Sequence, residues 1–314
     1  MAAHAAPPGH ASPDGPASPP RRGALLALAA ALPACASLFE RSVPPPPGAL
    51  DGGFAIERSL PKDLPQNAAP FSHSQFVLLA SESALVTLSP VPFVGEVVKG
   101  VMDAQAAVRY EARFGDLDPH RLAVRAWAGS PRLAPADRPR TDATPLLRPF
   151  AYLQECADGR FRIALVHRID APGWTGRYMV HLRSSHPVEA LAAPTPALLA
   201  AIGTELDEGT RLARTLVERD LDGAWARPIG TVDIGSFNLV GGRAAGLLSP
   251  ELQHDRDGAL LEEGPEHVVV RLKGMRGAAE ANGGLLFGVH RLRKDQMHHY
   301  RRIAGGAAAS QRTA

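Results

Sequence analysis

Residues 150–183 read FAYLQECADGRFRIALVHRIDAPGWTGRYMVHLR, and this stretch decides the fold. Asp158-Gly159 suits a two-residue hairpin turn, because both positions accept positive φ angles. Pro172-Gly173 turns the chain a second time. Between and after these turns apolar and polar residues alternate, which is the period of a strand with one face against a core. The stretch therefore predicts a three-stranded antiparallel meander over residues 150–157, 160–170 and 176–183.

A long amphipathic helix is predicted after the meander. Thr195 suits its N-cap, Pro196 its first position, and Gly223 its end. Gly203 and Gly209 each cost about 1 kcal/mol relative to Ala inside a helix, so they favour close packing against a neighbouring element. The apolar face consists of Leu198, Leu199, Ile202, Leu206, Leu212, Leu216 and Val217. Ion pairs are expected on the exposed face, between Asp207 and Arg211 and between Arg214 and Glu218.

Apolar runs with strand character lie on both sides of this helix. Further strands are predicted over residues 76–80, 84–88, 122–127, 231–240, 244–248, 267–272 and 285–292. Shorter helices are predicted from residue 90 to 115 and around 295–303, and a loop over 129–145. The grouping predicts an α+β fold with a mainly antiparallel sheet, one long amphipathic helix and one or two shorter helices.

The N-terminal segment has the pattern of an export signal. Arg21-Arg22 precedes a twelve-residue apolar stretch, residues 23–34, which is too short to span a membrane permanently. Cys35 follows directly. The string Leu32-Pro33-Ala34-Cys35 resembles the lipobox of bacterial lipoproteins, from which Pro33 at position −2 departs.

This resemblance implies that Cys35 is acylated, becomes the first residue of the mature chain and anchors it in a membrane. Ala36 follows the cysteine instead of Asp, and in a Gram-negative cell the behaviour of this family then implies sorting to the outer membrane. Three alternatives stay open: cleavage after Ala36 to give a secreted periplasmic protein, an uncleaved anchor, or a chance Ala-rich tract. Arg21-Arg22 also leaves twin-arginine export open.

The predicted domain organisation follows from these features. Residues 1–34 form the signal peptide, 35–70 a Pro-rich tether, 71–303 a globular α+β domain with a possible sub-boundary near 129–145, and 304–314 a disordered tail. An irregular arm packed on the domain is the alternative for the tether.

Charge and cysteine content restrict the partners. The chain has 34 Lys and Arg against 32 Asp and Glu, a formal charge of +2, so no global field favours nucleic acid. Cys35 and Cys156 are the only cysteines. If Cys35 is lipidated no intrachain disulfide can form, and Cys156 is expected to be a small buried apolar residue.

Two groups of histidines are candidates for chemistry. His290, His298 and His299 lie near the C-terminus, but their spacing matches no metal motif and a solvated basic helix is favoured. Five cations surround them and form a patch that could contact an anionic envelope polymer or lipid headgroups: Arg291, Arg293, Lys294, Arg301 and Arg302. His167 and His181 lie on neighbouring predicted strands, where some registers would bring them together.

Other catalytic signals are weak. Ser130 and Ser236 each have Gly on one side only, so neither forms a nucleophile elbow. Gly241-Gly242 and Gly283-Gly284 lack the spacing of phosphate loops, and Glu262 and Glu263 have the character of surface residues. No cofactor or metal is expected.

These observations predict an envelope lipoprotein with a non-enzymatic binding or assembly role toward an envelope protein or polymer. The alternative is an envelope hydrolase whose site is assembled from distant residues.

Overall fold

The structure is a computed structural model that describes residues 39–64, 68–79, 107–108, 110–135, 139–155, 160–234, 257–275, 287–297 and 300–303. These residues belong to the unit that begins at Phe39. The predicted signal segment with Cys35, the strands predicted at 84–88 and 244–248, Cys156 and the C-terminal tail lie outside the described residues.

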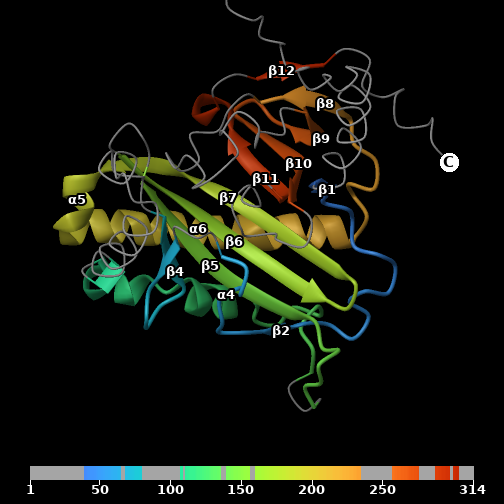
Figure 1. The fold of residues 1–314 in the computed structure, drawn as a ribbon, viewed down its shortest axis with the longest axis horizontal. Coiled ribbons are helices and arrows are strands. Elements are labelled where there is room, and N and C mark those ends of the chain that lie inside the picture. Colours follow the sequence, from blue (N-terminus) through green and yellow to red (C-terminus); the bar gives the residue numbers. More distant parts are fainter. Residues whose placement is uncertain are drawn as a thin grey trace, which may run out of the picture. The chain divides into compact units, whose positions relative to one another are not determined.

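A single open sheet organises these residues (Figure 1). Its strand order is β12-β8-β9-β10-β11-β7-β6-β5-β4-β3, with β1 paired to β10 and β2 paired to β5. The strands are β1 (Phe39–Arg41), β2 (Ala55–Ile56), β3 (Ala68–Pro70), β4 (Phe76–Leu79), β5 (Leu146–Glu155), β6 (Arg160–Ala171), β7 (Trp174–Pro187), β8 (Gly230–Asp233), β9 (Asp257–Glu263), β10 (His267–Met275), β11 (Gly288–Arg293) and β12 (Arg301–Arg302). Three pairs are parallel, β2–β5, β4–β5 and β7–β11, and the other described pairs are antiparallel. The prediction of a mixed α+β fold with a largely antiparallel sheet is confirmed.

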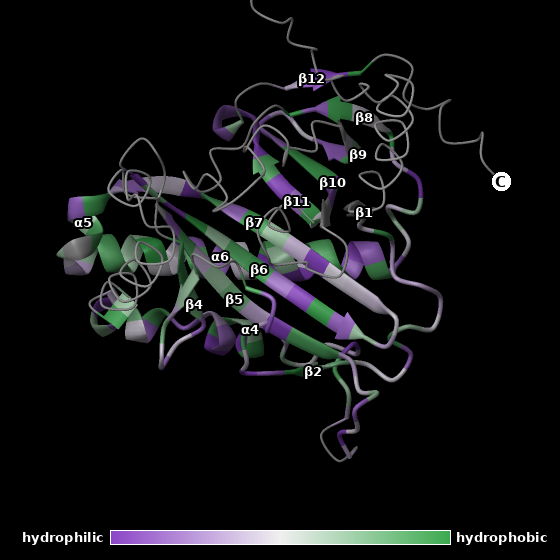
Figure 2. Ribbon diagram, viewed as in Figure 1, coloured by the Kyte–Doolittle hydropathy of each residue, from purple (hydrophilic) through white to green (hydrophobic). Residues whose placement is uncertain are grey.

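The predicted meander forms β5, β6 and β7. Leu146 of β5 lies opposite Asp170 of β6, and Ala171 of β6 lies opposite Trp174 of β7 across the Pro172-Gly173 turn. Figure 2 shows hydrophobic and hydrophilic residues alternating along β6 and β7. The central residues of β6 and β7 are nevertheless buried on both faces, so the prediction that the meander has only one face against a core is wrong.

Two helices of seven or more residues lie wholly within the described residues, α4 (Pro119–Trp127) and α6 (Pro196–Leu221). They contact each other and lie on the same face of the sheet (Figure 1). The short helical elements are η1 (Gly115–Leu117), α5 (Val188–Ala192) and η4 (Lys294–Gln296). The finer prediction of one long amphipathic helix with one or two shorter helices is corrected, because α4 forms where a strand was predicted and only η4 forms where a short helix was predicted near residue 295.

The α6 helix matches its prediction closely. The Thr195 hydroxyl accepts a hydrogen bond from the Leu198 N–H at 3.2 Å, and Pro196 occupies the first turn. A Cβ atom at Gly209 would lie 2.7 Å from Leu182 Cδ2, which explains the glycine by close contact with β7. The two predicted i,i+4 ion pairs, Asp207–Arg211 and Arg214–Glu218, are present at 3.1 and 2.8 Å.

Two predicted elements are wrong. Residues 122–127 form the end of α4 instead of a strand, because Asp118 caps the helix through the His120 N–H and Pro119 occupies its first position. Residues 295–303 form no α-helix in their described part, where η4 and β12 lie. The strand β9 was not predicted, whereas the described part of the helix predicted over 90–115 is helical.

Apolar clusters cover both faces of the sheet. The helix-side cluster includes Leu147, Leu165, Val180, Leu206 and Val217. The opposite face carries one cluster over β4 to β7, with Val77, Phe150, Tyr152, Val166 and Met179. A further cluster covers β8 to β11, with Val232, Leu260, Val268, Val270 and Leu292. Burial on both faces explains why several strands read as nearly continuous apolar runs.

Candidate functional site

Residues 39–64 form an arm that is packed on the sheet, here called the N-terminal arm. It adds β1 and β2, and the Glu57 N–H donates to the Leu147 carbonyl at 2.9 Å. Phe54 is fully buried and meets Trp127 of α4 edge to face, with ring centroids 5.0 Å apart. Residues 39–64 are therefore an arm packed on the domain and not the free tether that was predicted. Their backbone groups form hydrogen bonds with the sheet, and Phe54 is buried in the core.

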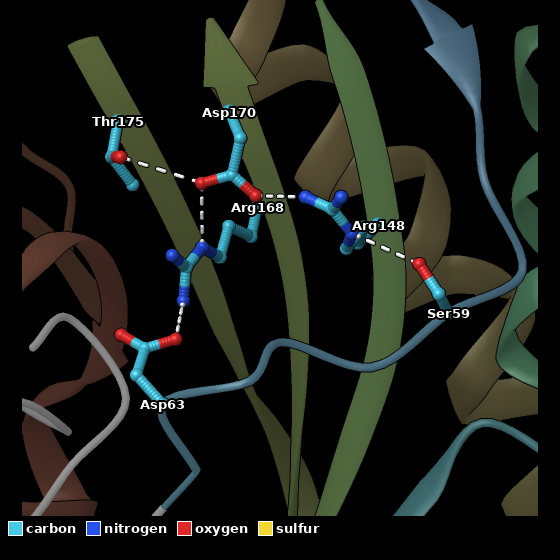
Figure 3. Close-up of polar contacts among 6 residues, drawn as sticks. All are labelled: Ser59, Asp63, Arg148, Arg168, Asp170 and Thr175. Atoms are coloured by element: carbon cyan, nitrogen blue, oxygen red, sulfur yellow. Dashed lines mark hydrogen bonds and ion pairs between the residues drawn. The ribbon is translucent and has the colours of Figure 1, made fainter. Parts of the chain in front are cut away.

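A polar network, here called the Arg–Asp clamp, ties the arm to β5 and β6 (Figure 3). Arg168 contacts both Asp63 of the arm, at 2.5 Å, and Asp170, at 2.9 Å. Arg148 pairs with Asp170, and its Nε donates to the Ser59 hydroxyl at 3.0 Å. The four charged side chains are between 12% and 27% exposed, and two positive groups balance two negative ones. The network is therefore suited to holding the arm in place rather than to capturing a charged ligand.

The arm borders a cavity of about 510 Å³. Its walls come from arm residues 46–53, from the loop at 139–145 and from Pro172 of the β6–β7 turn. Asp51 is the only ionisable side chain among the described residues that line it. The lining offers apolar contact and backbone hydrogen-bonding groups, which suits binding of an uncharged group better than acid–base chemistry.

A second cavity, of about 360 Å³, lies beside the first and shares Ala134, Pro139 and Thr144 with it. Among its described lining residues Arg140 is the only ionisable one, and Arg140 pairs with Glu57 of the arm at 2.9 Å. Among the described residues that line these two cavities there is no histidine and no pair of carboxylates.

His167 and His181 lie on opposite faces of the sheet. His167 is opposite Tyr178 and faces the helices, whereas His181 is opposite Ala164 and faces away from them. His167 is fully buried beside Trp127, and neither of its ring nitrogens has a hydrogen-bond partner among the described residues. Burial lowers its pKa to about 3, so the imidazole is neutral at physiological pH.

His181 contacts His290 instead. The parallel pairing of β7 with β11 brings His181 Nε2 within 3.3 Å of His290 Nδ1, with the two rings stacked. Burial, and then the positive charge of Arg177, lower the pKa of His181 to about 3. Arg177 is itself fully buried and donates to the Phe287 carbonyl at 3.0 Å. A neighbouring guanidinium opposes cation binding, and no group of three His, Cys, Asp or Glu residues placed to hold a metal occurs in the described part of the chain.

Four of the five cations of the predicted basic patch are paired with acids. Glu263 contacts Lys294 at 2.9 Å and also Arg302, and the hydrogen bond from Lys294 is the largest factor that lowers the Glu263 pKa to about 2. Arg293 contacts Asp295, and Arg301 contacts Asp233 at 3.2 Å. These pairs reduce the positive charge that the predicted patch would present. His298 and His299 lie outside the described residues.

A buried triad was missed by the sequence analysis. Asp220 of α6, 2% exposed, accepts hydrogen bonds from the Tyr178 hydroxyl at 2.9 Å and from Arg271 Nη2 at 2.5 Å. Burial raises the Asp220 pKa, while Arg271 opposes this rise. One signal was available, because Asp220 follows Ala213 and Leu216 at helical spacing and so belongs to the buried face. The triad joins α6 to β7 and β10.

The remaining candidates have structural roles or lie outside the described residues. Ser130 is buried, and its hydroxyl accepts from the Arg132 N–H at 3.3 Å within a turn. Glu262 pairs with Arg219 of α6. Ser236 and the glycine pairs at 241–242 and 283–284 lie outside the described residues.

Comparison of the chain with models of protein families, with curated proteins and with solved structures finds no match. Among the helices that the structure describes, none combines the length and the apolar character needed to cross a bilayer.

Proposed function

We propose that the chain is a bacterial envelope lipoprotein, anchored through Cys35, whose folded body has a binding or assembly role. The observation that carries the proposal is the order of Arg21-Arg22, the apolar residues 23–34 and the lipobox-like string that ends in Cys35. Ala36 after the cysteine favours the outer membrane as its location.

The position at which the folded body begins is compatible with cleavage before Cys35. The described unit begins at Phe39, so cleavage before Cys35 removes none of its residues. Two or three acyl chains on Cys35 give durable attachment, whereas one chain binds only reversibly. The cavity beside the N-terminal arm supports a binding role, since its lining suits uncharged groups of an envelope protein or polymer.

Metabolic labelling of bacterial cells with an alkyne fatty acid tests the anchor. The wild-type chain should incorporate the label and remain in the membrane fraction, and Cys35→Ser should lose both properties. Cys156→Ser is the matched control, because it removes the other cysteine and should label like the wild type. Equal labelling of the wild type and Cys35→Ser contradicts the proposal.

A further inference from the structure

We infer that the lipid bilayer contacts a defined end of the sheet, the end that carries β1 and the β6–β7 turn, so that the domain lies directly on the membrane. This inference rests on the proposed acylation of Cys35. It replaces the picture of a domain held clear of the membrane by a long tether. The occupant of the surface is the headgroup layer of the membrane that holds the acyl chains.

Chain length sets the first limit. Only residues 36–38 separate Cys35 from Phe39, where β1 begins. The four Cα–Cα steps from Cys35 to Phe39 span at most about 14 Å when the chain is fully extended. The fourteen residues of β7 extend over about 46 Å, so this spacer is short compared with the sheet. An acylated Cys35 therefore holds the start of β1 within about 14 Å of the headgroup layer.

The pairing of β1 fixes which end of the sheet this is. Phe39 lies opposite Met275 and Arg41 opposite Lys273, at the C-terminal end of β10. The chain then continues to Val43, whose carbonyl accepts a hydrogen bond from Trp174 Nε1 at 3.2 Å. Trp174 is the first residue of β7 and directly follows the β6–β7 turn. The far end of β7 leads into α5, on the side away from the anchor.

The described surface at this end suits contact with headgroups. Val43 is 54% exposed, although it is a large apolar residue. Pro44, Pro46, Pro47 and Pro172 are also exposed, and Pro46, Pro47 and Pro172 line the same cavity together with Asp51. Uncharged and apolar groups enter the bilayer interface without the desolvation cost that ionised groups carry. The cavity of about 510 Å³ is lined in part by these prolines, which places its mouth beside the membrane.

The experiment uses the full mature chain, purified with its native N-terminus and reconstituted into vesicles of phosphatidylethanolamine and phosphatidylglycerol. An environment-sensitive fluorophore is attached to a single introduced cysteine in a Cys156→Ser background. Val43→Cys places the label on the proposed surface. Glu189→Cys, an exposed position in α5, is the matched control at the opposite end. Brominated lipids in the vesicles then report the proximity of each label to the bilayer.

The label at Val43→Cys should lose several-fold more fluorescence to the brominated lipids than the label at Glu189→Cys. Equal quenching at both positions, or stronger quenching at Glu189→Cys, overturns the inference while leaving the anchor intact. Mass spectrometry of the same samples separates this failure from failure of the proposed function. If Cys35 carries no acyl chain, the proposed function and the inference that rests on it are both wrong.

Discussion

The buried His167 makes a sharp prediction about stability in acid. Its pKa is about 3 in the folded chain, against 6.5 for an ordinary histidine, and burial is the cause. The unfolded chain therefore binds a proton at this site as the pH falls below about 6.5, while the folded chain does not until about pH 3. Stability is thus lost progressively as the pH falls through this window.

The magnitude follows from the linkage relation. With these two pKa values, the contribution of His167 to the free energy of unfolding falls by about 2 kcal/mol at pH 5 and by about 3 kcal/mol at pH 4, relative to neutral pH. His167→Leu removes the titrating group and also the buried ring nitrogens that have no described hydrogen-bond partner. The variant should match or exceed the wild type at pH 7.5 and then hold an advantage that grows by about 2 kcal/mol on going to pH 5.

Urea denaturation followed by circular dichroism at pH 7.5, 6, 5 and 4 measures this difference. Leu165→Val is the matched control, because it changes the same face of β6 without a titratable group and should shift stability by an amount independent of pH. If the wild-type and His167→Leu curves run parallel from pH 7.5 to 4, the reasoning on buried His167 is refuted.

Three further predictions concern the triad, Gly288 at the start of β11 and the arm. Asp220→Ala leaves Arg271 without its buried carboxylate and should lower the free energy of unfolding, measured by urea denaturation, by about 3 to 5 kcal/mol. Asp222→Ala removes an exposed carboxylate and should lower it by less than about 1 kcal/mol. Equal losses in the two variants would contradict the stabilising role of the triad. Gly288 has φ +123°, and a Cβ there would overlap the Arg177 carbonyl, so Gly288→Ala should lower stability by about 3 kcal/mol. Gly173→Ala, at φ +74° but in open space, should cost about 1 kcal/mol by the same measurement, and the reverse order would be incompatible with this packing. Arg168→Ala should raise the rate of tryptic cleavage within the arm several-fold, since it removes the contact with Asp63; an unchanged rate means that the Arg–Asp clamp does not hold the arm.

Local signals in the sequence predicted part of the fold. The β5–β6–β7 meander and α6 were predictable because turn residues, a capping threonine and regular spacing of apolar residues all agreed. The six residues 122–127 were read as a strand because a short apolar run does not distinguish a strand from a helix. The decisive signal was Asp118-Pro119, which caps α4.

The candidate site depended on long-range pairing that no local signal contains. His181 meets His290 only because β11 pairs with β7 in parallel, 109 residues apart in sequence. The arm packs on the domain because Phe54 contacts Trp127 of α4. The prolines of the arm favour an irregular backbone but do not indicate whether that backbone is packed or free. The register of β6 and β7 places His167 and His181 on opposite faces of the sheet. The sequence does not fix that register, and a shift of one residue exchanges the faces of a strand.

The anchor is the claim on which the proposed function depends, and the N-terminal peptide of the mature protein tests it most directly. The protein is purified in detergent from the envelope of its native host, digested and analysed by mass spectrometry. The account predicts a peptide that begins at Cys35 and carries a thioether-linked diacylglycerol. A mature chain that begins at Ser37, or at any residue without a fatty acid, would contradict it.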